Sequence, residues 1–223
     1  METAVYTGSK SPTRKRGRRL PASSLKSTGG PFDRIGILTT FSNNQKIFSK
    51  GEPAEYLYKV ESGCIRTYRI LNDGRRRICA FYFPGDYFGL EAREDHSLSA
   101  DAITTSSVRI INRKTLASRS ARDIVVVKCL LNITAMELQR AQSLNLLLLK
   151  EAQERIVDFL LDMKSRKQSQ SEVDLPMPRS DIADYLGLAI ETVSRMFTRL
   201  RSASAISLPN LRSVILRDLS VLN

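Results

Sequence analysis

Four side chains near the C-terminal end of the chain have the types and the spacing needed to contact DNA bases. They are Ile190, Glu191, Ser194 and Arg195, on one side of a predicted helix over 190–201. A guanidinium donates two hydrogen bonds to guanine N7 and O6, and a carboxylate accepts one from cytosine N4. Arg195 and Glu191 lie one turn apart and therefore have the chemistry to recognise a single G·C pair. Ile190 suits a thymine methyl group, and Ser194 suits a thymine edge or a phosphate.

The other side of this predicted helix is apolar, which predicts that it is buried. Its apolar residues are Val193, Met196, Phe197 and Leu200. Gly187 separates the helix from a shorter one, for which Ser180 is the expected N-cap. Two helices joined by a sharp turn at a glycine are typical of a helix-turn-helix. The alternative is that Glu191 and Arg195 form only a surface ion pair, worth about 0.2–0.5 kcal/mol.

Two further features favour contact with DNA. Short strands predicted at 206–208 and 214–216 flank an expected turn at Pro209-Asn210, as the wing of a winged helix would. The net charge of +12 and the isoelectric point near 9.9 favour an anionic partner. Residues 1–30 carry seven basic residues against one acidic residue, so they supply +6 of this excess. This composition predicts that residues 1–30 form a disordered arm. Its functional interpretation is an arm that attracts DNA phosphates without sequence specificity.

A long helix with a coiled-coil periodicity is predicted before this region. Its seam residues recur at alternating steps of four and three: Val127, Leu131, Thr134, Leu138, Ala141, Asn145 and Leu148. A second apolar set lies beside the seam and is interrupted by Glu137 and Arg140: Val126, Leu130, Ile133, Leu144 and Leu147. We expect one side to pack on the chain's own β domain and the seam to pack on a partner helix. The alternative is a helix packed entirely within one monomer.

Short β-rich segments alternate with turn signals in the N-terminal half. The clearest segments are 56–60, 64–70 and 78–83, and Asn72-Asp73-Gly74 predicts a tight hairpin between the last two. Many short strands at regular spacing predict an antiparallel sandwich or jelly-roll barrel. A shorter amphipathic helix is expected at 152–164, followed by a polar loop.

These patterns divide the chain into four parts. We predict a disordered basic arm at 1–30, a sensor-like β-barrel domain at 31–121, a dimerisation helix at 122–150 and a winged helix-turn-helix at 151–223. The basic arm is not followed by the apolar core of a secretory signal, and the longest apolar run is too short to span a bilayer. The three cysteines are odd in number and widely spaced, which favours a reducing cytoplasm. We therefore predict a cytoplasmic protein with no membrane partner.

Taken together, these motifs resemble the Crp/Fnr family of bacterial transcription regulators, and most of all its FixK-type branch. The resemblance extends from about Phe32 to Asp218. It is carried by the segments 51–66, 73–78, 83–91, 177–188 and the Glu-Thr-Val-Ser-Arg motif at 191–195. It implies an α+β fold with a cyclic-nucleotide-binding-type β-barrel (jelly roll), a long dimerisation helix and a winged helix-turn-helix DNA-binding domain.

The resemblance also implies a function. The family's base-contacting positions correspond to Glu191, Ser194 and Arg195, with Ile190 at the position before the Glu. A homodimer would place its two recognition helices in successive major grooves about 34 Å apart on TTGA…TCAA-type palindromes. The protein would then act as an activator that recruits RNA polymerase, and its targets would serve low-oxygen respiration or nitrogen fixation.

The sequence departs from the family's ligand-binding patterns. Leu98-Ser99-Ala100 stands where cyclic-nucleotide-binding members have a phosphate-pairing Arg-Ser, and Glu91 cannot neutralise an anion. The N-terminal arm has no cysteine and the chain has three, so an iron–sulfur cluster with four thiolates cannot form within one chain. His96 is the only histidine, which excludes a site built from several imidazoles. We therefore predict no cofactor and no metal.

Some alternatives remain open at this stage. DNA binding could depend on an unknown small molecule, on haem held by His96, or on oxidation of a cysteine. No nucleophile–base pair or catalytic pair of carboxylates stands out, so no enzymatic activity is predicted. Ala189 replaces the family's usual N-capping Thr before the recognition helix, and Ser204 stands where a Gly commonly ends it.

Overall fold

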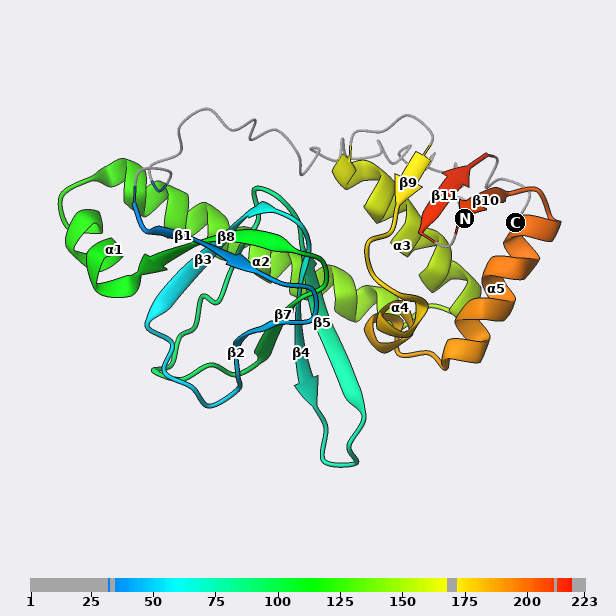
Figure 1. Ribbon diagram of the computed structural model, residues 1–223, viewed down its shortest axis with the longest axis horizontal. Coiled ribbons are helices and arrows are strands. Elements are labelled where there is room, and N and C mark those ends of the chain that lie inside the picture. The colour runs from blue at the N-terminus through cyan, green and yellow to red at the C-terminus, as the bar shows by residue number, and fades with distance from the viewer. Residues whose placement is uncertain (1–31, 33–34, 168–171, 211, 218–223) are drawn as a thin grey trace, which may run out of the picture.

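The structure, a computed structural model, describes residues 32, 35–167, 172–210 and 212–217. The predicted arm at 1–30 lies outside the described residues. Two antiparallel four-stranded sheets form the N-terminal half, and a long helix runs along them (Figure 1). Helices and a small three-stranded sheet form the C-terminal half. The α+β fold class is therefore confirmed. The predicted sandwich or jelly-roll arrangement is present as an open sandwich, because the edge strands of both sheets pair on one side only.

The first sheet has the strand order β1-β8-β3-β6 and the second has the order β2-β7-β4-β5. The strands are β1 (Ile37–Phe41), β2 (Lys46–Phe48), β3 (Tyr56–Ser62), β4 (Ile65–Ile70), β5 (Arg76–Tyr82), β6 (Tyr87–Phe88), β7 (Ser99–Ala102) and β8 (Ser106–Asn112). The hairpin predicted at Asn72-Asp73-Gly74 is confirmed. Ile70 pairs with Arg76, and Gly74 adopts a φ of 82°, which a residue with a Cβ rarely does.

Aromatic side chains fill much of the space between the two sheets. Phe88 stacks on both Phe48 and Tyr58, and the His96 ring lies parallel to Phe48 with 3.7 Å between the ring centroids. His96 is buried, and this burial lowers the pKa of its imidazole. The one histidine of the chain therefore packs inside the sandwich.

Three helices follow the sandwich along the chain. Helix α1 (Arg113–Ser120) was not predicted; Asn112 caps it by accepting hydrogen bonds from the Lys114 and Thr115 amides. Helix α2 (Ile124–Leu148) confirms the predicted long helix. Helix α3 (Ala152–Lys167) continues past the expected end at residue 164, so the first part of the predicted polar loop is helical. None of the helices within the described ranges is long and apolar enough to cross a bilayer.

One side of α2 packs on the sandwich as expected, with Val126 and Ile133 buried. The charged residues that interrupt this side have partners on the sandwich. Tyr82 donates a 2.9 Å hydrogen bond to Glu137, and Arg140 donates a 3.1 Å hydrogen bond to Asp86. Burial raises the pKa of Glu137. The interruption is therefore a polar contact that aligns the helix with the sheet.

The C-terminal half consists of α3, α4 (Arg179–Leu186), α5 (Ile190–Ser202) and the sheet β10-β11-β9, formed by β9 (Glu172–Asp174), β10 (Ile206–Asn210) and β11 (Ser213–Leu216). Two details of the prediction are wrong. Helix α4 has Pro178 as its N-cap instead of Ser180, because the Pro178 carbonyl accepts the amides of Asp181 and Ile182. The expected turn at Pro209-Asn210 is strand, since Asn210 pairs with Ser213.

Helix α5 ends in a left-handed turn at a residue that is not glycine. Ser204 adopts a φ of 58°, its amide bonds the Arg201 carbonyl at 3.0 Å, and the Ala205 amide bonds the Leu200 carbonyl at 3.0 Å. This is the Schellman pattern, in which glycine is the favoured residue at the left-handed position. Ser204 is therefore a strained position directly after α5.

We expect Ser204→Gly to raise the free energy of unfolding by roughly 0.5–1 kcal/mol, because a left-handed backbone costs an L-residue about 1–2 kcal/mol and the added chain entropy of glycine cancels part of the gain. Urea unfolding followed by circular dichroism measures the change. Ser202→Gly, within α5, is the matched control and should lower stability by about 0.5 kcal/mol. Equal effects of the two changes would contradict this assignment.

Candidate nucleic-acid interface

Helix α5 lies at the end of the molecule opposite α1 and has one apolar and one polar side (Figure 1). The apolar side is buried as predicted, with Val193, Phe197 and Leu200 inside the core. The predicted base-contacting residues are all exposed: Ile190, Glu191, Ser194 and Arg195. We call these four residues the recognition surface. Ile190 is 43% exposed.

The side chains of Glu191 and Arg195 are unengaged. Within the described ranges, no salt bridge joins them and neither side chain makes a hydrogen bond. The alternative of a simple i, i+4 ion pair is therefore absent from the structure. A carboxylate and a guanidinium one turn apart remain available to acceptors and donors on base edges.

The turn between α4 and α5 sets the direction of the recognition surface. Gly187 adopts a φ of 65°, and the Leu188 amide bonds the Ala183 carbonyl at 3.0 Å, which ends α4. Ala189 is the N-cap of α5 and makes no side-chain capping bond, as its sequence predicts. The amide groups at the start of α5 therefore lack a side-chain cap and lie beside the recognition surface.

Arg179 belongs to this region and was not predicted from the sequence. Its guanidinium carbon lies 3.4 Å from the centroid of the Phe197 ring, and its buried Nη1 has no hydrogen-bond partner among the described residues. Burial lowers its pKa to about 10. This contact places a cation at the start of α4, packed against α5. The Pro-Arg pair at 178–179, which begins this helix, is the sequence signal that could have identified it.

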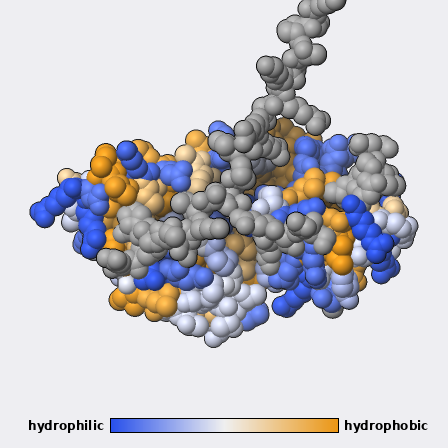
Figure 2. Space-filling model, turned by 90° about the horizontal axis from the view of Figure 1, so that it is seen from above, coloured by the Kyte–Doolittle hydropathy of each residue, from blue (hydrophilic) through white to orange (hydrophobic). Residues whose placement is uncertain are grey.

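The C-terminal half also carries additional exposed arginines. They are Arg199 and Arg201 in the last turn of α5, Arg212 between the wing strands and Arg217 after them. Hydrophilic and hydrophobic patches lie side by side on the described part of the face shown in Figure 2. The C-terminal half thus presents the four predicted base-contacting residues and several exposed arginines to solvent.

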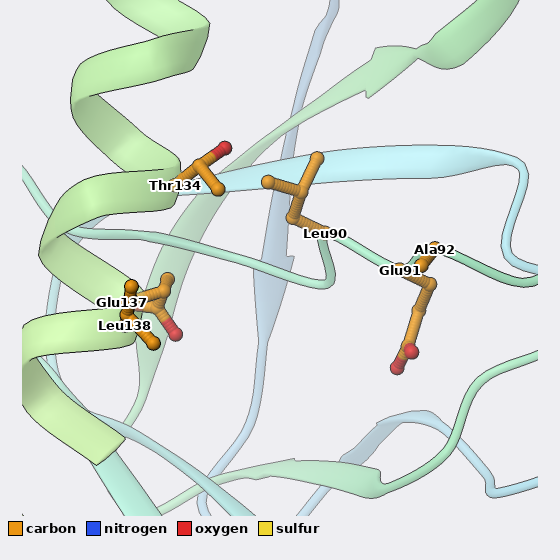
Figure 3. A pocket seen from close by; sticks show the side chains of 6 residues that line it. All are labelled: Leu90, Glu91, Ala92, Thr134, Glu137 and Leu138. Carbon is orange, nitrogen blue, oxygen red and sulfur yellow. The ribbon is translucent and has the colours of Figure 1, made fainter. Parts of the chain in front are cut away.

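The sandwich has two open pockets near α2. A cavity of about 410 Å³ lies between α2 and the segment after β6 (Figure 3). It is lined by Leu90, Glu91, Ala92, Thr134, Glu137 and Leu138. A smaller pocket of about 110 Å³ at the mouth of the sandwich includes Leu98.

The chemistry of these pockets does not suit a cyclic phosphate. Glu91 and Glu137 line both of them, and no lysine or arginine is among the described lining residues. Glu91 accepts hydrogen bonds from the Ser97 amide and hydroxyl at 3.0 Å. Two carboxylates would repel a phosphate group instead of holding it. In the described part of the chain, no cluster of three or more His, Cys, Asp or Glu side chains has the arrangement of a metal site.

Most of the predicted seam on α2 is exposed in the part of the chain that the structure describes. Leu131 is 65% exposed and Leu138 is 60% exposed. Thr134, Ala141 and Asn145 are also exposed, while Val127 and Leu148 are half-buried. An apolar strip of this length on the surface of a helix marks an interaction site.

The comparisons with known proteins are consistent along the chain. The family model of the cyclic nucleotide-binding domain matches residues 38–123, and that of the Crp-like helix-turn-helix domain matches residues 154–223. The nitrogen fixation regulation protein FixK of Azorhizobium caulinodans is 44% identical over 195 residues, which are 84% of this chain and 78% of that protein. FixK of Rhizobium meliloti is 38% identical, over 83% of this chain and 86% of that protein. The solved structure of FixK2 from Bradyrhizobium japonicum superimposes with a TM-score of 0.80 and 41% identity, covering 84% of this chain and 96% of that one.

Proposed function

The chain belongs to the Crp/Fnr family of DNA-binding transcription regulators, and from this premise we propose that it binds as a homodimer to palindromes of the TTGA…TCAA type. It is a regulator and not an enzyme, as the relatives' names indicate. Each recognition helix would enter a major groove, and the two-fold symmetry of the dimer would match that of the palindrome.

The observation that carries this proposal is the recognition surface. Glu191 and Arg195 are exposed and unengaged on a helix whose opposite side is fixed by burial of Val193 and Phe197. A rigid helix with free polar groups at its N-terminal end is the geometry by which a helix-turn-helix reads base edges. In our proposal Arg195 donates to guanine, Glu191 accepts from cytosine, and Arg179 contacts a phosphate.

Homodimerisation is supported by the exposed seam on α2. Leu131 and Leu138 occupy seam positions one heptad apart, and a second copy of the helix would bury both. A parallel pairing about a two-fold axis also places two C-terminal halves on the same side of the dimer. This is what a palindrome with two half-sites requires.

We further propose that no cyclic nucleotide activates the protein, because Glu91 and Glu137 line the pockets where its phosphate would bind. The amount of protein synthesised would then set its activity. As an activator it would recruit RNA polymerase in the cytoplasm. Its targets would serve low-oxygen respiration or nitrogen fixation, in keeping with the names of the FixK relatives.

Fluorescence anisotropy with a labelled TTGA…TCAA duplex tests this function. We expect the full-length protein to bind the palindrome at least about 10³-fold more tightly than a scrambled duplex of equal composition at moderate salt. Addition of cyclic AMP should leave both curves unchanged. Equal affinity for the two duplexes would contradict sequence-specific binding, and a large gain with cyclic AMP would contradict ligand-independent activity.

A further inference from the structure

The C-terminal half is attached to the sandwich by a buried cluster of charged side chains. Asp181 on α4 is only 1% exposed, and its carboxylate accepts a 2.7 Å hydrogen bond from Arg66 on β4. Arg76 on β5 donates to the other oxygen of the same carboxylate. Asp181 thus joins one helix of the helix-turn-helix to two strands of the other half of the chain.

Neighbouring groups complete this cluster. Asp101 accepts a 3.2 Å hydrogen bond from Arg66, and Asp184, one turn after Asp181, accepts a 2.8 Å bond from Arg76. We call Arg66, Arg76, Asp101, Asp181 and Asp184 the ion-pair cluster. Each of its arginines bridges two carboxylates, so no carboxylate in the cluster lacks a cation.

The contacts around the cluster leave little freedom of movement. Arg77 donates a 3.1 Å hydrogen bond to the Asp184 carbonyl, and its guanidinium lies so close to Gly187 that a Cβ there would be 2.6 Å from Nη1. The rings of Phe81 and Tyr185 lie 5.1 Å apart across the same interface. Helix α4 and strand β5 therefore pack side by side, as their contacts indicate (Figure 1).

We propose that Asp181 is a positioning residue: together with Arg66 and Arg76 it fixes the orientation of the recognition helix relative to the dimerisation helix. The chain connection between α2 and α3 is only the short segment 149–151, which does not by itself fix an angle. Directional charge-assisted hydrogen bonds fix an orientation more narrowly than apolar contact does. The inference rests on the proposed function, since the orientation matters only when two recognition helices bind one palindrome.

The attached arrangement is compatible with DNA binding, because it leaves the recognition surface open. Glu191, Ser194 and Arg195 are exposed while Asp181 is buried against β4 and β5. An inhibitory attachment would cover the recognition surface instead. The ion-pair cluster thus holds the C-terminal half through α4, on residues that are not part of the recognition surface.

The test measures how DNA binding depends on the spacing between half-sites. Duplexes carry the two half-sites at the natural spacing or with one to three base pairs added or removed, and a further duplex carries one half-site. Wild type should prefer one spacing. In Asp181→Asn, the Kd for the preferred palindrome should rise at least about tenfold, and the Kd values at the different spacings should become similar. The reason is that a dimer gains avidity only when both recognition helices are oriented to bind their half-sites at the same time. Affinity for the single half-site should stay within about twofold, since the recognition surface is unchanged.

Asp73→Asn is the matched control, because it removes the same charge from an exposed pair with Arg75 in the β4–β5 hairpin. It should behave as wild type on every duplex. Should Asp181→Asn fail to fold, Arg76→Gln provides a second variant, since Arg76 is half-exposed and its loss leaves the Arg66–Asp181 bond in place. Three results in a folded variant would overturn the proposal. The variant could keep the wild-type spacing preference, bind the preferred palindrome more tightly than wild type, or lose affinity for the single half-site. If wild type itself does not distinguish the palindrome from scrambled DNA, the proposed function fails instead.

Discussion

Arg195→Ala is expected to raise the Kd for the palindrome by roughly 10- to 100-fold and to remove discrimination at one G·C pair in each half-site. A bidentate guanidinium–guanine contact contributes about 1–3 kcal/mol of discrimination. Arg195 makes no hydrogen bond or salt bridge within the described protein, so its removal costs little stability. Affinity for scrambled DNA should fall much less, because phosphate contacts dominate that binding. Fluorescence anisotropy titrations with both duplexes measure the two effects.

Arg201→Ala is the matched control for this prediction. Arg201 is exposed in the last turn of the same helix, about 9 Å further along the axis at the usual rise per residue. Its loss should weaken binding to both duplexes equally. The magnitude of the slope of the logarithm of the binding constant against the logarithm of the salt concentration should fall by about one, as expected when one phosphate contact is lost. If Arg195→Ala weakened both duplexes to the same extent as this control, Arg195 would be a phosphate contact and not a base contact.

The second large effect concerns the seam of α2. Leu131→Glu combined with Leu138→Glu should convert the dimer into a monomer, because each subunit would bring two carboxylates into an apolar helix pair. Analytical ultracentrifugation at micromolar concentration should show the monomer mass. Affinity for the palindrome should fall at least about 10²-fold, since the second half-site no longer contributes. Folding should be retained, as both leucines are exposed in the single chain.

A control with the same added charge and the same heptad spacing exists on another face of α2. Asn132→Glu combined with Gln139→Glu introduces the carboxylates at exposed positions outside the seam. This variant should remain a dimer. If both double variants stayed dimeric, the seam would not be the dimer contact. If both became monomeric, net charge and not the seam would be the cause.

Local patterns in the sequence predicted a large part of the recognition site. The exposed and buried sides of α5 follow from a helical period over 190–201 that Val193 and Phe197 make apolar on one side. The Asp-Gly pair at 73–74 identified its hairpin because few other residues adopt that backbone. In both cases the determining interactions lie within a few residues of one another.

Interactions between distant residues could not be predicted in this way. Asp181 looked like an ordinary acidic residue in the first turn of a helix, because its partners Arg66 and Arg76 lie more than a hundred residues earlier in the chain. The role of Arg140 and Glu137 as partners of the sandwich was hidden for the same reason. Helix α1 was missed because its start depends on a single capping residue, Asn112, directly after a strand.

The base-recognition role of Arg195 is tested most directly by a double-mutant cycle between protein and DNA. Wild type and Arg195→Ala are each titrated against the palindrome and against a duplex in which the G·C pair of both half-sites is replaced by A·T. Wild type should lose roughly 10- to 100-fold in affinity with the altered duplex, and Arg195→Ala should bind the two duplexes equally. If the base change cost Arg195→Ala as much as it costs wild type, the two losses would be independent and Arg195 would not contact that pair.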